Sequence, residues 1–89
     1  MPYTIQLKPA AIRELIKLPK DVQRSIRSRI DALANNPFPP DAKKLEGEEE
    51  FYRIKIGDCR IIYQVHKKSP FTLVIRIGHR KEVYRRISR

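Results

Sequence analysis

The chain has 89 residues, 40% hydrophobic and 34% charged, with 20 Lys and Arg against 10 Asp and Glu and a single cysteine. This length predicts one domain over residues 1–89, with a core too small for a deep cofactor site. The chain has no run of about 18 apolar residues and no charged start followed by an apolar stretch, which argues against a membrane span and a signal peptide. The lone Cys59 cannot form an internal disulfide, which fits a reducing compartment such as the cytoplasm.

Residues 3–7 alternate between apolar and polar side chains, which predicts a short strand. Pro9 suits the first turn of a helix, which should run to about Pro19. Its apolar stripe consists of Ala11, Ile12, Leu15 and Ile16. A second helix should follow Pro19 and stop at the Asn-Asn-Pro of residues 35–37. Its stripe consists of Val22, Ile26, Ile30 and Leu33. We expect the two helices to form an antiparallel hairpin.

Residues 37–50 combine three prolines, a glycine and a mixed charge run, which predicts a loop crossing from the helices to a sheet. Residues 51–56 and 59–66 alternate on either side of Gly57-Asp58, a typical hairpin turn. A third strand is expected at 71–80, followed by a basic tail. The predicted fold is α+β: an N-terminal strand, a helix hairpin, and an antiparallel three-strand meander that forms a small twisted sheet with the helices packed on one face.

The hairpin turn decides which side chains share a face of the sheet. If Gly57 and Asp58 form the turn, Lys55 lies opposite Arg60, and opposed residues share a face. One face is then largely apolar and packs under the helices: Tyr52, Ile54, Ile56, Ile61, Tyr63, Val65, Leu73, Ile75 and Ile77. The other is predicted to carry five cations and no carboxylate, namely Arg53, Lys55, Arg60, Arg76 and Arg80, with Ile62, Gln64, His66, Thr72 and Val74 between them.

The positive charge is concentrated in the second part of the chain. Residues 1–50 hold nine basic and eight acidic side chains, whereas residues 51–89 hold eleven basic and two acidic ones. Two cations directly opposite each other on a sheet cost roughly 0.2–1 kcal/mol, so a missing anion would explain the pair Lys55 and Arg60. The alternative is that a basic protein simply fills the polar face of its sheet with Lys and Arg. Charge alone does not choose among a nucleic acid, an anionic membrane and an acidic protein.

Two segments carry a family resemblance. FYRIKIGDCRIIYQV at 51–65 and VIRIGHRKEVYRR at 74–86 resemble the two signature stretches of RelE-type toxins from bacterial and archaeal toxin–antitoxin pairs. The likeness covers nearly the whole chain, because the predicted elements come in the same order. It implies a small ribonuclease that cuts mRNA in the ribosomal A site without metal or cofactor and is silenced by a cognate RelB-like antitoxin. Whether the toxin–antitoxin complex binds operator DNA stays open.

The resemblance places functional positions of the family on Arg53, Lys55, Arg60, Arg80 and Tyr84. Some members carry lysine where this chain has Arg53. Arginine is a poor base, so any proton-accepting role falls on Lys55. The alternative is that Lys55 contacts the phosphate without accepting a proton.

The remaining positions suit charge stabilisation and RNA binding. Arg53 and Arg60 can present planar guanidinium groups to the scissile phosphate, and Arg80 can assist the leaving oxygen electrostatically. Ordinary RNA binding is the alternative for each, and Arg76 joins this RNA-binding set. Tyr84 can stack on a base or anchor the tail.

Three functions remain in competition. Besides the ribonuclease, the same fold is used by ParE-like inhibitors of DNA gyrase, which do not need a phosphate-centred site. The third is a nucleic-acid-binding module that cuts nothing. No metal site is expected, because two histidines and one cysteine lack the spacing of metal ligands.

Overall fold

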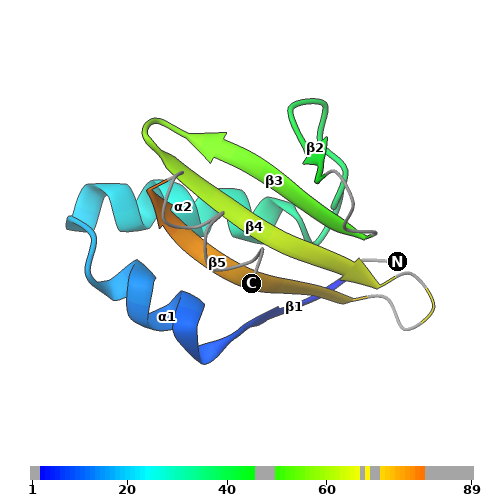
Figure 1. Ribbon diagram of the computed structural model, residues 1–89, viewed down its shortest axis with the longest axis horizontal. Coiled ribbons are helices and arrows are strands. Elements are labelled where there is room, and N and C mark those ends of the chain that lie inside the picture. Colours follow the sequence, from blue (N-terminus) through cyan, green and yellow to red (C-terminus); the bar gives the residue numbers. More distant parts are fainter. Residues whose placement is uncertain (1–2, 46–49, 67, 69–70, 80–89) are drawn as a thin grey trace.

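The computed structural model describes residues 3–45, 50–66, 68 and 71–79. Its elements in chain order are β1 (Thr4–Leu7), α1 (Pro9–Ile16), α2 (Lys20–Ala32), β2 (Lys43–Lys44), β3 (Phe51–Ile56), β4 (Cys59–His66) and β5 (Phe71–His79). Both helices lie on one side of the sheet, and α2 runs back along it after the chain turns (Figure 1). The predicted α+β arrangement is confirmed. Within the described residues, neither helix is long and apolar enough to cross a membrane.

The strands form one mixed sheet in the order β1-β5-β4-β3-β2. The meander of β3, β4 and β5 is antiparallel, as predicted. The N-terminal strand joins the same sheet, parallel to β5, with Thr4 beside Phe71 and Leu7 beside Val74. Because β1 ends there, the second part of β5 has no strand on its outer side among the described residues, and α1 packs against it instead.

The register of the β3–β4 hairpin is the predicted one. Lys55 pairs with Arg60, and Ile56 pairs with Cys59. Gly57 turns the chain with a φ of +58°, a left-handed conformation that glycine adopts without strain. The turn therefore places Lys55 and Arg60 on the same face of the sheet.

In β5 the predicted alternation of faces fails at a β-bulge. The adjacent residues Ile62 and Tyr63 of β4 pair with Arg76 and Val74, so Ile75 is the extra residue. A bulge of one residue exchanges the two faces on one side of it. Residues 76 and 77 keep the predicted faces, whereas residues 72–74 do not.

Four predicted positions are consequently wrong. Thr72 and Val74, expected on the basic face, are fully buried in the sheet. Leu73, expected in the core, pairs with Gln64 and lies on the opposite face. Ile75, also expected in the core, is only half-buried at the bulge.

The core lies between the helices and the sheet. It is formed by Ala11, Leu15, Ile26, Ile30, Leu33, Ile54, Cys59, Ile61, Tyr63, Val65, Val74 and Ile77. The predicted stripe of α2 is confirmed, since Val22 packs against this cluster as well. The stripe of α1 is only half right: Ile12 and Ile16 are 45% and 64% exposed.

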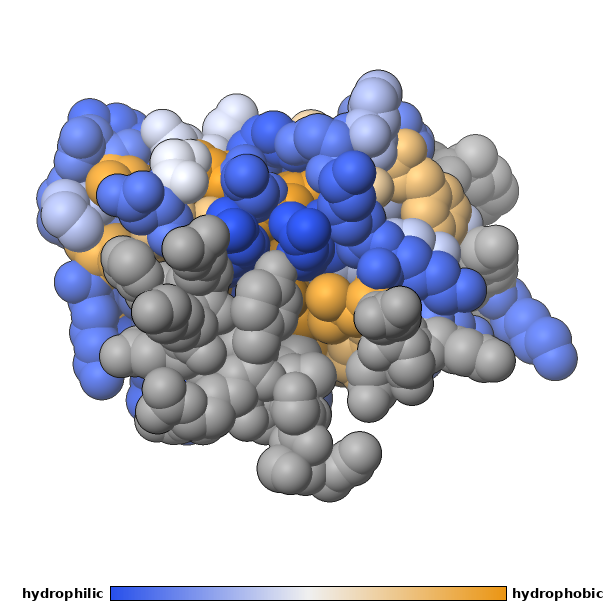
Figure 2. Space-filling view, turned by 45° about the horizontal axis from the view of Figure 1, so that its top comes forward, coloured by the Kyte–Doolittle hydropathy of each residue, from blue (hydrophilic) through white to orange (hydrophobic). Residues whose placement is uncertain are grey.

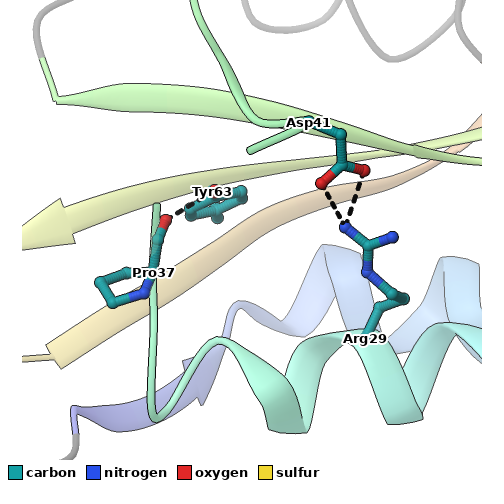
Figure 3. Close-up of polar contacts among 4 residues, drawn as sticks. All are labelled: Arg29, Pro37, Asp41 and Tyr63. Carbon is teal, nitrogen blue, oxygen red and sulfur yellow. Dashed lines mark hydrogen bonds and ion pairs between the residues drawn. The ribbon is translucent and has the colours of Figure 1, made fainter. Parts of the chain in front are cut away.

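Side-chain hydrogen bonds fix the connections that flank α2. The Gln23 amide donates to the Leu18 carbonyl at 2.8 Å and so holds the turn between the helices. The Tyr63 hydroxyl donates to the Pro37 carbonyl at 2.8 Å (Figure 3), which ties the proline-rich crossing to the centre of the sheet. Burial raises the pKa of Tyr63, so the hydroxyl keeps the proton that it donates.

Replacing Tyr63 with phenylalanine should lower the free energy of unfolding by about 1 kcal/mol, because the buried Pro37 carbonyl loses its donor. Urea denaturation followed by circular dichroism measures this loss. Tyr52, which stacks on Tyr63 at a centroid distance of 5.9 Å, provides the matched control. Its hydroxyl makes no hydrogen bond within the described ranges, so Tyr52→Phe should leave stability nearly unchanged. Equal losses in both variants would contradict this role of Tyr63.

Candidate nucleic-acid interface

The side of the sheet turned away from the helices is rich in cations. We call the set Lys43, Arg53, Lys55, Arg60 and Arg76 the basic face. They come from all strands except β1: Lys43 from β2, two from β3, Arg60 from β4 and Arg76 from β5. Strongly hydrophilic residues gather across the middle of the surface in Figure 2. The strand pairing places Arg53, Lys55, Arg60 and Arg76 on this face, as predicted, and adds Lys43.

Lys55 and Arg60 form the centre of this face. They are directly paired across β3 and β4, and Lys55 is exposed whereas Arg53, two residues earlier, is half-buried. Neither Lys55 nor Arg53 forms an ion pair with any described carboxylate. Like charges are therefore held close together, which raises the local affinity for an anion.

Arg60 differs from the other cations because it is almost inaccessible, with 8% of its surface exposed. On its other side it is paired with Gly78, which has no side chain to contact it. Its Nε is buried, and among the described residues it has neither a hydrogen-bond partner nor a carboxylate paired with it. A buried guanidinium without an anionic partner is costly, so Arg60 is a group whose charge an anion would stabilise.

Lys43 is a site residue that sequence reasoning missed. The predicted crossing loop contains the two-residue strand β2, which pairs Lys43 with Arg53 and Lys44 with Tyr52. Lys43 is exposed and shares the face of Arg53. Two residues are too few to show the alternation that predicts a strand, so no signal in the sequence could have found it.

A carboxylate from outside the sheet, which was not predicted from the sequence, pairs with Arg76. Glu14 of α1 forms an ion pair with the Arg76 guanidinium, and its Oε1 also accepts from Arg76 Nε at 3.1 Å. The same oxygen accepts from the backbone N–H of Ile77 at 2.9 Å. Glu14 thereby covers the outer edge of β5 beyond the end of β1. It also compensates the charge of Arg76, whereas no described carboxylate compensates Lys55 or Arg53.

Replacing Glu14 with alanine should lower the free energy of unfolding by about 2 kcal/mol, because the Ile77 N–H and the Arg76 guanidinium both lose their partner. Thermal and urea denaturation measure this. Glu14→Gln retains an acceptor for the N–H and should lose about half as much. Identical stability of the alanine variant and the parent chain would show that the edge of β5 does not depend on Glu14.

Two predicted site residues, Arg80 and Tyr84, lie outside the described residues. β5 ends at His79, one residue before the predicted end of the third strand. The site that can be described is therefore Lys43, Arg53, Lys55 and Arg60, with Arg76 engaged by Glu14 at its border.

The comparison with protein families and the comparison with individual proteins both find toxins. The family model described as the ParE toxin of the type II toxin–antitoxin system matches residues 5–84. A protein of Escherichia coli named as a RelE-like toxin is 30% identical, covering 91% of this chain and 86% of its own length. A protein of Methanocaldococcus jannaschii named as toxin RelE1 is 27% identical over 96% of this chain and 98% of its own.

A solved structure agrees with the sequence relatives. The fold is similar to that of the toxin chain in the archaeal RelE–RelB complex of Pyrococcus horikoshii, with a TM-score of 0.80 and 30% identity, covering 90% of this chain and 97% of that chain. The likeness thus extends over both the helices and the sheet that carries the basic face.

Proposed function

Because the chain belongs to the RelE/ParE superfamily of toxins from type II toxin–antitoxin systems, we propose that it is a metal-independent endoribonuclease that cleaves mRNA on the ribosome. The observation that carries this proposal is the directly opposed pair Lys55 and Arg60, with Arg53 on the same face and no described carboxylate paired with any of the three. Such an arrangement is suited to a phosphate that gains negative charge during reaction.

The chemistry requires three actions on one RNA linkage. The 2′-hydroxyl must lose its proton and attack the neighbouring phosphorus, the phosphorane must be stabilised, and the 5′-oxygen must be protonated as it leaves. We assign proton removal to Lys55, because it is the lysine paired directly with Arg60 across the hairpin, and the neighbouring Arg53 and Arg60 carry guanidinium groups, which are poor bases. Arg60 and Arg53 stabilise the phosphorane through charge-assisted hydrogen bonds.

Two further roles follow from the family resemblance alone. Arg80 assists the leaving 5′-oxygen electrostatically, and Tyr84 stacks on a base next to the cleaved linkage. Stacking of this kind contributes about 1–3 kcal/mol per base. These roles complete the proposed catalytic set of Lys55, Arg60, Arg53, Arg80 and Tyr84.

The proposed partner is a RelB-like antitoxin. The related archaeal toxin was solved in complex with RelB, and a basic face with uncompensated cations favours a partner with acidic segments. An acidic segment laid over Lys55 and Arg60 would exclude RNA from the site. The proposed place of action is the cytoplasm, where ribosomes translate.

The test is a cleavage assay with the full-length chain, translating ribosomes and a defined mRNA. We expect cuts within the A-site codon, products with a 2′,3′-cyclic phosphate and a 5′-hydroxyl, and unchanged activity when 1,10-phenanthroline removes transition metals. The same mRNA without ribosomes is the control. Products with a 5′-phosphate would contradict attack by the 2′-hydroxyl, and intact mRNA on ribosomes would contradict the activity itself.

Inhibition of DNA gyrase is the second candidate, favoured by the match to the family model named after ParE. This activity is a binding event and does not need a phosphate-centred pair of cations. A supercoiling assay with purified gyrase separates the two candidates. Loss of supercoiling at toxin concentrations that leave mRNA intact would select the gyrase inhibitor.

A further inference from the structure

A second cationic site lies at the outer edge of β3, where the strand faces α2. It is a depression of about 530 Å³ lined by Arg24, Ser25, Ser28, Arg29, Lys55 and Ile56. Lys55 also belongs to the basic face, so the two sites share one side chain. The depression therefore continues the basic face around the edge of the sheet.

The local structure explains why these residues meet. The four helix residues occupy positions i, i+1, i+4 and i+5 of α2, which lie on one side of a helix. On the sheet side, β2 pairs with β3 only at Tyr52 and Arg53. The end of β3 that carries Lys55 and Ile56 consequently has no described strand on its outer side, and α2 is its neighbour.

The charges in the depression are only partly compensated. Arg29 Nη2 contacts both carboxylate oxygens of Asp41, at 2.9 and 3.0 Å (Figure 3). This hydrogen bond from Arg29 lowers the pKa of Asp41, although the carboxylate is half exposed. Arg24 and Lys55, by contrast, have no ion-pair partner within the described part of the chain. Two uncompensated cations thus remain beside a guanidinium that is held in place.

The donor set fits a phosphate group better than a carboxylate. Guanidinium, ammonium and two serine hydroxyls can approach a tetrahedral anion from several sides, whereas a carboxylate is satisfied by one planar guanidinium. In an RNA chain the phosphates recur at a short, regular spacing, so a strand bound across the basic face brings further phosphates to its edge. A site for a single small anion, in contrast, would not need to lie next to Lys55.

We propose that this depression is a second phosphate-binding subsite for the RNA, formed by Arg24, Ser25, Ser28 and Arg29 and linked to the basic face through the shared Lys55. The inference rests on the proposed function in that the basic face is taken to bind RNA. Its role is to hold the RNA chain on one side of the reacting linkage and so to fix its path.

The test uses the full-length chain and a fluorescein-labelled, 2′-O-methylated RNA of about 12 nucleotides, which lacks the attacking hydroxyl and cannot be cleaved. Fluorescence anisotropy is recorded over a series of salt concentrations. Arg24→Ala should weaken binding roughly tenfold, the size of a lost charge-assisted hydrogen bond. The slope of log K against log salt should become shallower by about 0.7, which corresponds to one phosphate contact on a single strand.

Arg27→Ala is the matched control, because Arg27 is exposed on the same helix, carries the same charge and does not line the depression. It should change the affinity by no more than about twofold through long-range electrostatics. Equal effects of the two substitutions would show a diffuse attraction to charge and overturn the subsite. An Arg24→Ala variant that binds RNA normally, or that loses only its affinity for an antitoxin, would overturn it as well.

The proposed function and the subsite can fail separately. If ribosome-bound mRNA stays intact while Arg24→Ala still weakens RNA binding, the subsite stands and the ribonuclease is excluded. If the parent chain cleaves mRNA and Arg24→Ala alters neither affinity nor salt dependence, the ribonuclease stands and the subsite is excluded.

Discussion

Replacing Lys55 with alanine is expected to slow ribosome-dependent cleavage of mRNA by about 100- to 10,000-fold, the range typical for loss of a general base. Lys55 is the described lysine that is directly paired with Arg60, and its side chain is exposed. Single-turnover cleavage on programmed ribosomes measures the loss. The alanine variant should remain folded, since an exposed lysine without a described ion-pair partner adds little to stability.

Lys55→Arg separates proton removal from simple phosphate binding. Arginine preserves the positive charge but keeps its proton at any pH that the ribosome tolerates, so it cannot act as a base. If Lys55 removes the proton, Lys55→Arg should be nearly as inactive as Lys55→Ala. Substantial activity in Lys55→Arg would instead assign Lys55 to phosphate contact.

The fold was predictable wherever a local feature determines the geometry. Pro9 and Pro19 mark the starts of the helices, and Gly57-Asp58 sets the register of the hairpin, so the pairing of Lys55 with Arg60 follows from the sequence. In β5, residues 73–77 read Leu-Val-Ile-Arg-Ile and give no alternation that would locate a bulge. The bulge depends on how β5 fits against β4, which is a contact between segments distant in sequence.

The same distinction applies to the site. Its centre follows from strand alternation, but its borders depend on contacts across long stretches of chain. Glu14 reaches Arg76 from a position 62 residues away in the chain, and Lys43 joins Arg53 through a strand of only two residues. The i, i+1, i+4, i+5 spacing of Arg24 to Arg29 was visible in the sequence. What the sequence did not contain was that Lys55 would lie opposite that side of α2.

Arg60→Met is expected to reduce cleavage by about 100- to 1,000-fold, the effect of removing one donor that stabilises transition-state charge. The same substitution should leave the free energy of unfolding unchanged or raise it by about 1 kcal/mol, because it replaces a buried cation lacking a described partner with an apolar side chain of similar length. Single-turnover cleavage and urea denaturation measure the two quantities on the same preparation. Arg60→Lys, which keeps the charge but not the planar group, serves as the control for geometry.

The opposite signs of these two effects distinguish a binding role from a structural one. A guanidinium retained for the fold would lose stability on replacement, and the loss of activity would then follow from unfolding. A guanidinium retained to bind phosphate instead destabilises the free protein. This destabilisation is removed when an anion binds to the guanidinium. Inorganic phosphate should therefore raise the melting temperature of the parent chain more than that of Arg60→Met, because a ligand stabilises a protein only through its affinity for the folded state. Equal shifts would place phosphate binding elsewhere on the molecule and remove Arg60 from the proposed site.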